Sequence, residues 1–229
     1  MLLRDADLCQ DTILIRLYMK PLKFIALFTL ISITAFGQTK SDVFKEDVPV
    51  TWLGLDFTTT KLIGDREKYG SESDVRHLLD AWNGLIINEP EKFDIARSID
   101  KKSVENAIDV TKDHNTELDV MGMFSNEPKD YLHVKPSDVE QIVSEYDFKG
   151  KTGIGLMFIV ESFNKINEEG SIWVTFISMD SKEVLFSERL TAPPKGFGMR
   201  NFWAGCIYTI LTKMEKKEFE MWRKKHYRP

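Results

Sequence analysis

The residues best suited to chemistry form a glycine-rich turn near the end of the chain, residues 196–203, Gly-Phe-Gly-Met-Arg-Asn-Phe-Trp. Its two glycines permit positive φ angles or a close backbone approach. The helix that should follow offers free N–H groups to an anion. A carboxylate or phosphate site would use Gly196, Gly198, Arg200, Asn201 and Trp203. The simpler interpretation needs no ligand: the glycines shape a strand-to-helix turn, and Phe197, Phe202 and Trp203 seal the end of the core.

Asp56 and Glu161 are carboxylates within otherwise apolar strand patterns. A buried acid must be paired or protonated, and Arg189 or Arg200 is a suitable partner. A structural ion pair is the favoured interpretation. The alternative is a small hydrolase or anion-ligand enzyme that uses Asp56, Glu161, Arg200 and Asn201, and it requires these four side chains to converge in a solvent-reachable cleft.

One pair of short motifs resembles elements of serine β-lactamases and penicillin-binding proteins. Ser98-Ile-Asp-Lys101 matches Ser-x-x-Lys, and residues 151–153 read Lys-Thr-Gly. The two motifs lie close together in the chain, and the nearest Ser-x-Asn, which begins at Ser162, follows Lys-Thr-Gly where those enzymes have it first. We interpret the match as coincidence, because such short motifs recur by chance.

No metal or cofactor site is predicted from the sequence. The four histidines are scattered without ligand spacing. Asp109, Asp113 and Glu117 would share one face of a helix, where a solvated acidic stripe is the simpler interpretation. Cys206 lies on the apolar side of the last predicted helix and is interpreted as a small core hydrophobe.

Residues 19–37 have the three-part pattern of a secretory signal. Met-Lys-Pro-Leu-Lys precedes the apolar run 24–36, and Ala35 and Gly37 fit cleavage before Gln38. Because a membrane span needs about 20 apolar residues, an uncleaved anchor is the weaker alternative. Residues 1–18 carry three aspartates ahead of this segment and are interpreted as a non-native extension. Cys9 lacks the context of a lipid-attachment site.

The chain has 229 residues and a formal net charge of −5, which excludes the basic footprint of a nucleic-acid-binding protein. The tail 223–228 is basic and could touch an anionic surface, although cations also suit a helix C-terminus without any partner. Residues 38–49 are polar and predicted to be a flexible leader. Residues 50–229 have the length of one domain with a substantial core.

Apolar periodicity predicts the order β-α-α-β-α-β-β-β-α. Residues 154–165 are apolar on both faces, as in a central strand. Residues 172–179 and 183–191 continue as an antiparallel meander. The meander is preceded by a strand at 50–57, a loop at 58–70, a helix from about 71, a short helix after Pro90, an outer strand at 104–110, an undecided stretch at 111–124 and a helix capped by Ser137 and Glu140. An amphipathic helix reaching Trp222 ends the chain.

The expected fold class is α+β, like an α/β sandwich: a mixed sheet of about five strands covered by three to four helices. This order of elements resembles the periplasmic α/β domain of the TolB N-terminal part and of the penicillin-binding-protein activator lipoproteins. Those relatives bind other envelope proteins. The resemblance implies a non-enzymatic, periplasmic or secreted binding domain without a cofactor. Its expected partner is another cell-envelope protein or a small anionic ligand, with membrane contact only through the uncleaved signal.

Overall fold

The computed structural model describes residues 37–227. The extension 1–18 and the predicted signal segment 19–37, apart from Gly37, lie outside the described residues. Within residues 37–227, none of the helices combines the length and the apolar character needed to span a membrane.

One seven-stranded sheet organises the described residues. Its strands are β1 (Val50–Asp56), β2 (Lys61–Ile63), β3 (Glu105–Asn106), β4 (Phe124–Ser125), β5 (Ile154–Asn164), β6 (Glu169–Ser178) and β7 (Glu183–Ala192). The helices are α1 (Lys40–Val43), α2 (Glu72–Asn88), α3 (Ile95–Ser98), α4 (Asp109–Thr116), α5 (Pro136–Glu145), α6 (Met199–Lys213) and α7 (Phe219–His226), with 3₁₀ turns η1 (Arg66–Lys68), η2 (Val120–Met123) and η3 (Pro128–Asp130) and a π turn η4 (Met214–Glu218).

β5 lies at the centre of the sheet. One side of β5 pairs in parallel with β1 and, further along, with β2. Its other side pairs antiparallel with β6, which pairs antiparallel with β7. The predicted α+β class is confirmed, and Phe158 and Ile159 are both fully buried. The prediction of about five strands was too low, because β2 and β4 continue the lines of β1 and β3 as short separate strands.

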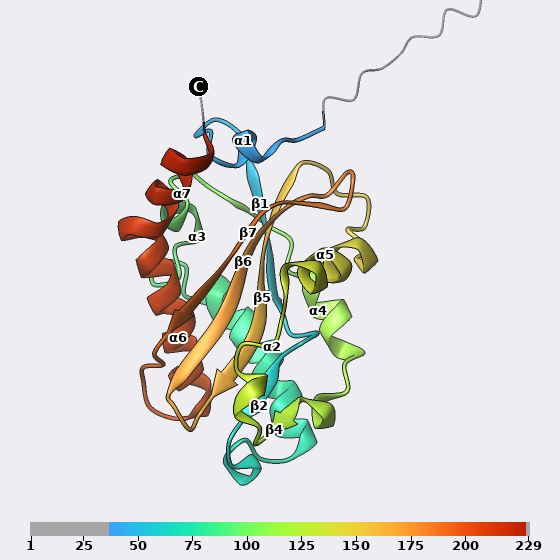
Figure 1. Ribbon diagram of the computed structural model, residues 1–229, viewed down its shortest axis with the longest axis vertical. Helices are drawn as coiled ribbons and strands as arrows, with labels where there is room; N and C mark the ends of the chain where they lie inside the picture. Colours follow the sequence, from blue (N-terminus) through green and yellow to red (C-terminus); the bar gives the residue numbers. More distant parts are fainter. Residues whose placement is uncertain (1–36, 228–229) are drawn as a thin grey trace, which may run out of the picture. The chain divides into compact units, whose positions relative to one another are not determined.

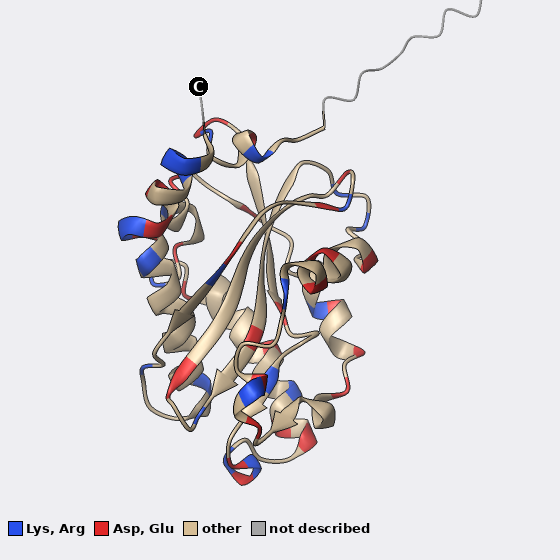
Figure 2. Cartoon of the chain, in the orientation of Figure 1, with Lys and Arg blue, Asp and Glu red and all other residues tan. Residues whose placement is uncertain are grey.

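Helices cover both faces of the sheet (Figure 1). The larger core lies on the face of α2, α6 and α7 and contains Trp82, Phe163 and Trp203. The smaller core lies on the face of α4 and α5 and contains Val139 and Tyr146. Charged residues of both signs are spread over the helices and loops, while most of the sheet is uncharged (Figure 2). The sheet therefore separates two packing environments.

The outer edge of β1 is closed by side chains rather than by a full neighbouring strand. Asn83 of α2 accepts from the N–H of Leu55 at 2.7 Å and donates to its carbonyl at 3.1 Å. Asn115 of α4 accepts from the N–H of Phe57 and also donates to the Leu55 carbonyl. Thr111 donates to the carbonyl of Leu53 at 2.7 Å. Buried backbone groups need such partners, and these three side chains supply them.

This edge explains why the predicted outer strand at 104–110 was wrong beyond its first residues. On this edge, β3 is the only described strand that pairs with β1, and it does so over Thr51 and Trp52 alone. The chain then turns into α4, which brings Thr111 and Asn115 to the remaining edge. The predicted loop at 58–70 was also incomplete, since it contains β2 and η1.

The leader predicted to be flexible, residues 38–49, is instead packed onto the domain. Thr39 and Asp42 form a capping box that starts α1. Val43 and Phe44 are buried, and the Phe44 ring lies 5.5 Å from those of Phe186 and Phe219. Burial of these two adjacent apolar side chains stabilises the ordered segment. The polar composition of residues 38–49 did not indicate this packing.

The helix α5 begins one residue earlier than its predicted cap. Pro136 occupies its first turn, and the Asp138 carboxylate accepts from the backbone N–H of Lys135 at 2.8 Å. Ser137 and Glu140, predicted as the capping pair, lie inside the helix. A proline suits the first helical position because its missing N–H would have no partner there.

The C-terminal helix is continuous through α6, the π turn η4 and α7. The inward stripe of α6 ends at the buried Met214. Regular α spacing would next turn the charged Lys217 and Glu218 toward the core. The wider π turn inserts one extra residue and brings Phe219 and Trp222 inward instead, where both are buried.

Gly54 is expected to be irreplaceable in β1. Its φ is +104°, and an added Cβ would lie 2.4 Å from Thr111 Oγ1 and 2.7 Å from Asn83 Oδ1. We predict that Gly54→Ala lowers the free energy of unfolding by roughly 2–5 kcal/mol, through backbone strain and overpacking. Urea denaturation measures this change.

Gly84→Ala is the matched control. Gly84 lies within α2, with only Asn88 Nδ2 near an added Cβ, at 3.8 Å. Replacing a helix-interior glycine by alanine should raise the free energy of unfolding by about 0.5–1 kcal/mol. Equal stability of the Gly54→Ala variant and the wild type would contradict the proposed closure of the β1 edge.

Candidate functional site

The turn at residues 196–203 has the backbone that its glycines suggested. Gly196 has a φ of +129°, and an added Cβ would lie 2.9 Å from the carbonyl oxygen of Asn201. Gly198 is the N-cap of α6, with a φ of +76° and no side-chain cap. The N–H of Lys195 donates to the Phe202 carbonyl at 3.0 Å and closes the turn. Both glycines are therefore explained by backbone geometry without a ligand.

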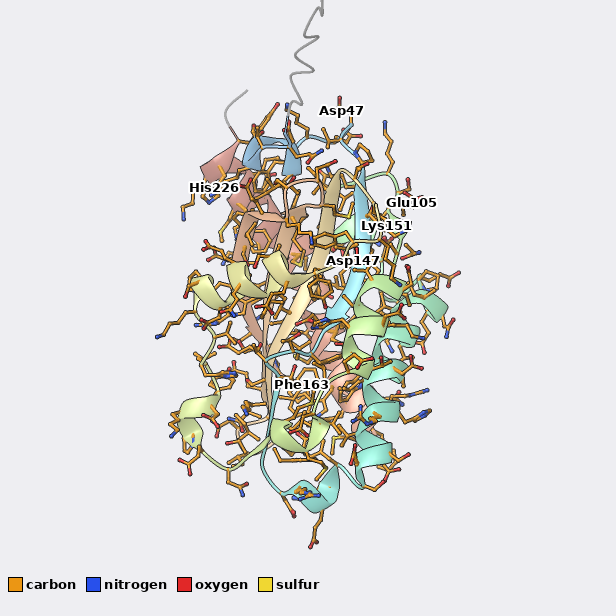
Figure 3. All side chains as sticks on the ribbon, turned by 90° about the vertical axis from the view of Figure 1, so that its right-hand side faces the viewer. Asp47, Glu105, Asp147, Lys151, Phe163 and His226 are labelled. Atoms are coloured by element: carbon orange, nitrogen blue, oxygen red, sulfur yellow. The ribbon has the colours of Figure 1, made fainter. Side chains whose placement is uncertain are left out.

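Trp203 belongs to the core and not to a ligand surface. Its side chain is fully buried, and its ring stacks on Phe163 at 4.5 Å with an interplanar angle of 10°. Figure 3 labels Phe163 in the interior of the domain. The Trp82 indole donates to the carbonyl of Arg200 at 2.9 Å and fixes the start of α6 against α2.

The side chains of Arg200 and Asn201 are exposed, and Arg200 Nε donates to Asn201 Oδ1 at 3.2 Å. Phe197, expected to help seal the core, is instead 95% exposed. Phe197 comes two residues after Lys195. The backbone of Lys195 packs so closely against Gly205 of α6 that a Cβ added to Gly205 would clash with the Lys195 carbonyl oxygen. This tight packing directs the tip of the turn away from the core.

The turn between β5 and β6, residues 165–168, lies at the same end of the sheet as residues 196–203, because Gly170 at the start of β6 pairs with Ala192 at the end of β7. Its Ile166 is 65% exposed. Lys165 Nζ lies 3.5 Å from the centroid of the partly buried Phe202 ring, which links the two turns. We name this surface the turn patch; its members are Lys165, Ile166, Lys195, Phe197, Arg200 and Phe202.

Asp56 lies on the opposite face of the sheet, at the end of β1. It is fully buried, and its carboxylate accepts from Tyr146 Oη at 2.5 Å, from Thr58 Oγ1 at 2.7 Å and from the Thr58 N–H at 3.1 Å. Burial raises the pKa of Asp56, while the hydrogen bonds from Tyr146 and Thr58 act in the opposite direction. Burial also raises the pKa of Tyr146.

Glu161 is also fully buried on the α5 face, two residues after Ile159, which pairs with Asp56. Its partner is Arg189, one of the two arginines considered, with Nε 2.8 Å from Oε2. Ser171 Oγ donates to Oε2 at 2.6 Å and the Val134 N–H donates to Oε1 at 2.7 Å. Arg189 also donates to the Val134 carbonyl and lies over the Trp173 ring at 4.6 Å. The group is a structural ion pair that fastens the loop before α5 to the sheet.

The four side chains proposed for an enzyme therefore do not converge. Asp56 and Glu161 are sealed beneath α5, whereas Arg200 and Asn201 are exposed at the start of α6 on the other face. The geometric condition for the alternative function is not met by the described residues.

Sequence reasoning missed a hydroxyl and an imidazole beside Asp56. Thr58 Oγ1 lies 2.9 Å from His114 Nε2, and the His114 ring lies 4.6 Å from that of Tyr146. Cavities of about 350 Å³ adjoin Thr58 on one side and His114 on the other. The threonine hydroxyl connects the buried carboxylate to a partly exposed imidazole. No local signal reveals the contact, since the residues are 56 positions apart.

The remaining motifs have structural roles. Ser98 Oγ donates to the Ile95 carbonyl at 2.7 Å, and Lys101 Nζ donates to the Lys45 carbonyl. Burial lowers the pKa of Lys101. Asp109 and Asp113 share Lys149, at 3.4 and 2.5 Å. Among residues 37–227, no three His, Cys, Asp or Glu side chains form a group able to hold a metal ion.

Neither the protein-family models nor the curated proteins compared with this chain give a match.

The buried Asp56 should make stability depend on pH in a defined direction. Its pKa in the folded protein is raised above the ordinary value of 3.8. Between pH 3.8 and the folded-state pKa, the native protein therefore binds more protons than the unfolded chain. Its contribution is therefore fully present below pH 3.8 and is lost as pH rises through the folded-state pKa. Asp56→Asn cannot ionise. We predict that the stability of this variant, relative to wild type, increases with pH. Urea midpoints measured from about pH 4 to pH 8 test this; a constant difference would contradict it.

Removing the charge of one partner of the Glu161–Arg189 pair should destabilise the protein. Glu161→Gln removes the charge that compensates Arg189, and we predict a loss of about 3–5 kcal/mol in the free energy of unfolding. Lys92→Gln, in the exposed Glu89–Lys92 pair, is the control and should change stability by less than about 1 kcal/mol. Similar losses in both variants would rule out a special role for the buried pair.

Proposed function

We propose that the protein is an exported, periplasmic or secreted domain that binds another cell-envelope protein through the turn patch and performs no catalysis. The signal pattern at residues 19–37 supports export. The separation of the candidate acids from Arg200 and Asn201 favours binding over the hydrolase alternative. The order of elements resembles domains that bind envelope proteins, which adds an argument by analogy only.

The observation that carries this proposal is the 95% exposure of Phe197. Burying an aromatic side chain of this size contributes about 1.5–3 kcal/mol. The backbone beneath Phe197 is fixed by Gly196, Gly198 and the start of α6, so a partner would not have to order the turn first. Aromatic side chains that become buried at the centre of an interface carry much of its binding energy.

The charges around Phe197 favour an acidic partner surface. Lys195 and Arg200 flank it in sequence, and neither forms an ion pair with another described residue. Lys165 contacts Glu168 at 3.2 Å and is partly neutralised. Cations at the rim of an interface steer an oppositely charged partner and set its orientation.

The free edge of β7 extends this surface. β7 pairs with β6 alone, and no other backbone-to-backbone hydrogen bond joins residues 183–192 to the described chain. At its end, the carbonyls of Thr191 and Ala192 accept from the side chains of Lys213 and Cys206. β7 runs into the turn that carries Phe197. A partner anchored on Phe197 could therefore also add an extended segment along β7, a known mode of peptide recognition.

Phe197→Glu tests the proposal. The side chain is exposed, so stability should be unchanged within about 0.5 kcal/mol. Loss of an anchor should weaken partner binding by about 2 kcal/mol, or roughly 30-fold in Kd. A photo-crosslinking residue at position 197 in exporting cells should capture one envelope protein, whose affinity for the purified variants is then measured.

Met221→Glu is the matched control, because Met221 is 43% exposed on α7, away from the turn patch. It should bind as well as wild type. Trp203→Ala is not a suitable binding variant, because removing this fully buried indole should cost about 3–5 kcal/mol of stability. Equal binding by Phe197→Glu and wild type, or the capture of no envelope protein from position 197, would refute the proposed interface.

A further inference from the structure

The first residue after the predicted cleavage site is held by a specific hydrogen bond. Ser178, the last residue of β6, donates from Oγ to Gln38 Oε1 at 2.7 Å. Ser178 is 1% exposed. Its Oγ also faces the N–H of Ser181 at 3.4 Å, which leaves the hydroxyl proton free for Gln38.

The chain that follows Gln38 is fixed on the domain. The Thr39 N–H and hydroxyl both donate to Asp42 Oδ2, at 2.8 and 2.7 Å. Phe44 is buried, and Lys101 donates to the carbonyl of Lys45. Residues 38–45 are therefore part of the folded unit and present Gln38 in one place.

We propose that Gln38, once it becomes the N-terminal residue, cyclises to pyroglutamate, and that Ser178 promotes this step. The inference rests on the proposed export, which includes cleavage after Gly37. The neutral α-amine attacks Cδ of the side-chain amide. An N–Cδ bond forms, the Cδ–Nε2 bond breaks, and ammonia leaves with the proton lost by the amine. Nothing is oxidised or reduced.

Ser178 is placed to assist because it donates to the oxygen on which negative charge develops. Attack at Cδ converts the amide into a tetrahedral intermediate whose charge lies on Oε1. A donor already aimed at that oxygen stabilises the intermediate more than the ground state. Ser178 would thus be a positioning and polarising residue for a reaction of the chain on itself.

The contacts of Gln38 are compatible with the product. Oε1 is the atom bonded by Ser178, and it stays as the lactam carbonyl. Nε2 is the atom that leaves, and it makes no hydrogen bond to another described residue. Cyclisation also removes the positive charge of the terminal amine. The product has no free α-amine, so aminopeptidases could not begin to remove the segment that carries Val43 and Phe44.

The test follows the N-terminal peptide by mass spectrometry. The full chain is produced in a Gram-negative host, and the exported protein is isolated soon after induction and incubated at neutral pH. We expect a peptide that begins at Gln38, becomes lighter by one ammonia molecule and then resists aminopeptidase. Ser178→Ala should cyclise at least about tenfold more slowly. Ser144→Ala, at an exposed position of α5, should match wild type. Gln38→Asn should keep a free amine, because its lactam would need a four-membered ring.

Each outcome has a defined meaning. A peptide that begins at Gln38 and keeps its amine overturns the inference but leaves the proposed export intact. A peptide that begins at Met1 or Met19 overturns both the inference and the cleaved signal on which the proposed export rests. A peptide that begins at another residue overturns the inference alone. Cyclisation at the same rate in Ser178→Ala and wild type overturns the role of Ser178.

Discussion

The constraint on which this structure depends is the closure of the outer edge of β1. A buried strand must satisfy every backbone N–H and C=O group, yet β3 pairs with only two residues of β1. Asn83 and Asn115 substitute for the missing strand with their amide groups. Because Asn83 comes from α2 and Asn115 from α4, the same hydrogen bonds also position the helices of both faces relative to the sheet.

The positions of the acidic side chains follow from this arrangement. Asp56 directly precedes the break between β1 and β2, where the strand ends beneath Tyr146, and its carboxylate binds the Thr58 N–H as the chain turns. Glu161 neutralises Arg189 and holds the loop before α5. Both acids stabilise irregular backbone next to the sheet. The buried acids on this face thus hold the connecting loops against the sheet, while the opposite face carries the turn with the exposed Phe197.

The central part of the fold could be predicted from the sequence because its signals are local. The run from Ile154 to Val160 is apolar on both faces, which is the pattern of a strand covered on both sides. The amides of Asn83 and Asn115 could not be predicted, since they act 28 to 60 residues away and look like solvated positions on their own helices. The same holds for Thr58 and His114. The strand-to-helix turn at residues 196–203 was predicted from its two glycines. The sequence could not show which aromatic side chain of the turn is buried: Trp203 stacks on Phe163, whereas Phe197 is exposed to solvent.

The π turn at Met214–Glu218 has a consequence for how this chain tolerates changes in length. Deleting one residue there would let an uninterrupted α-helix form, a locally favourable outcome. However, every later side chain would rotate by about 100° around the axis. Phe219 and Trp222 would leave the core, and charged neighbours would enter it. The extra residue of the π turn therefore keeps the apolar side chains of α7 facing the sheet, so that the length of the C-terminal helix is as strictly determined as its composition.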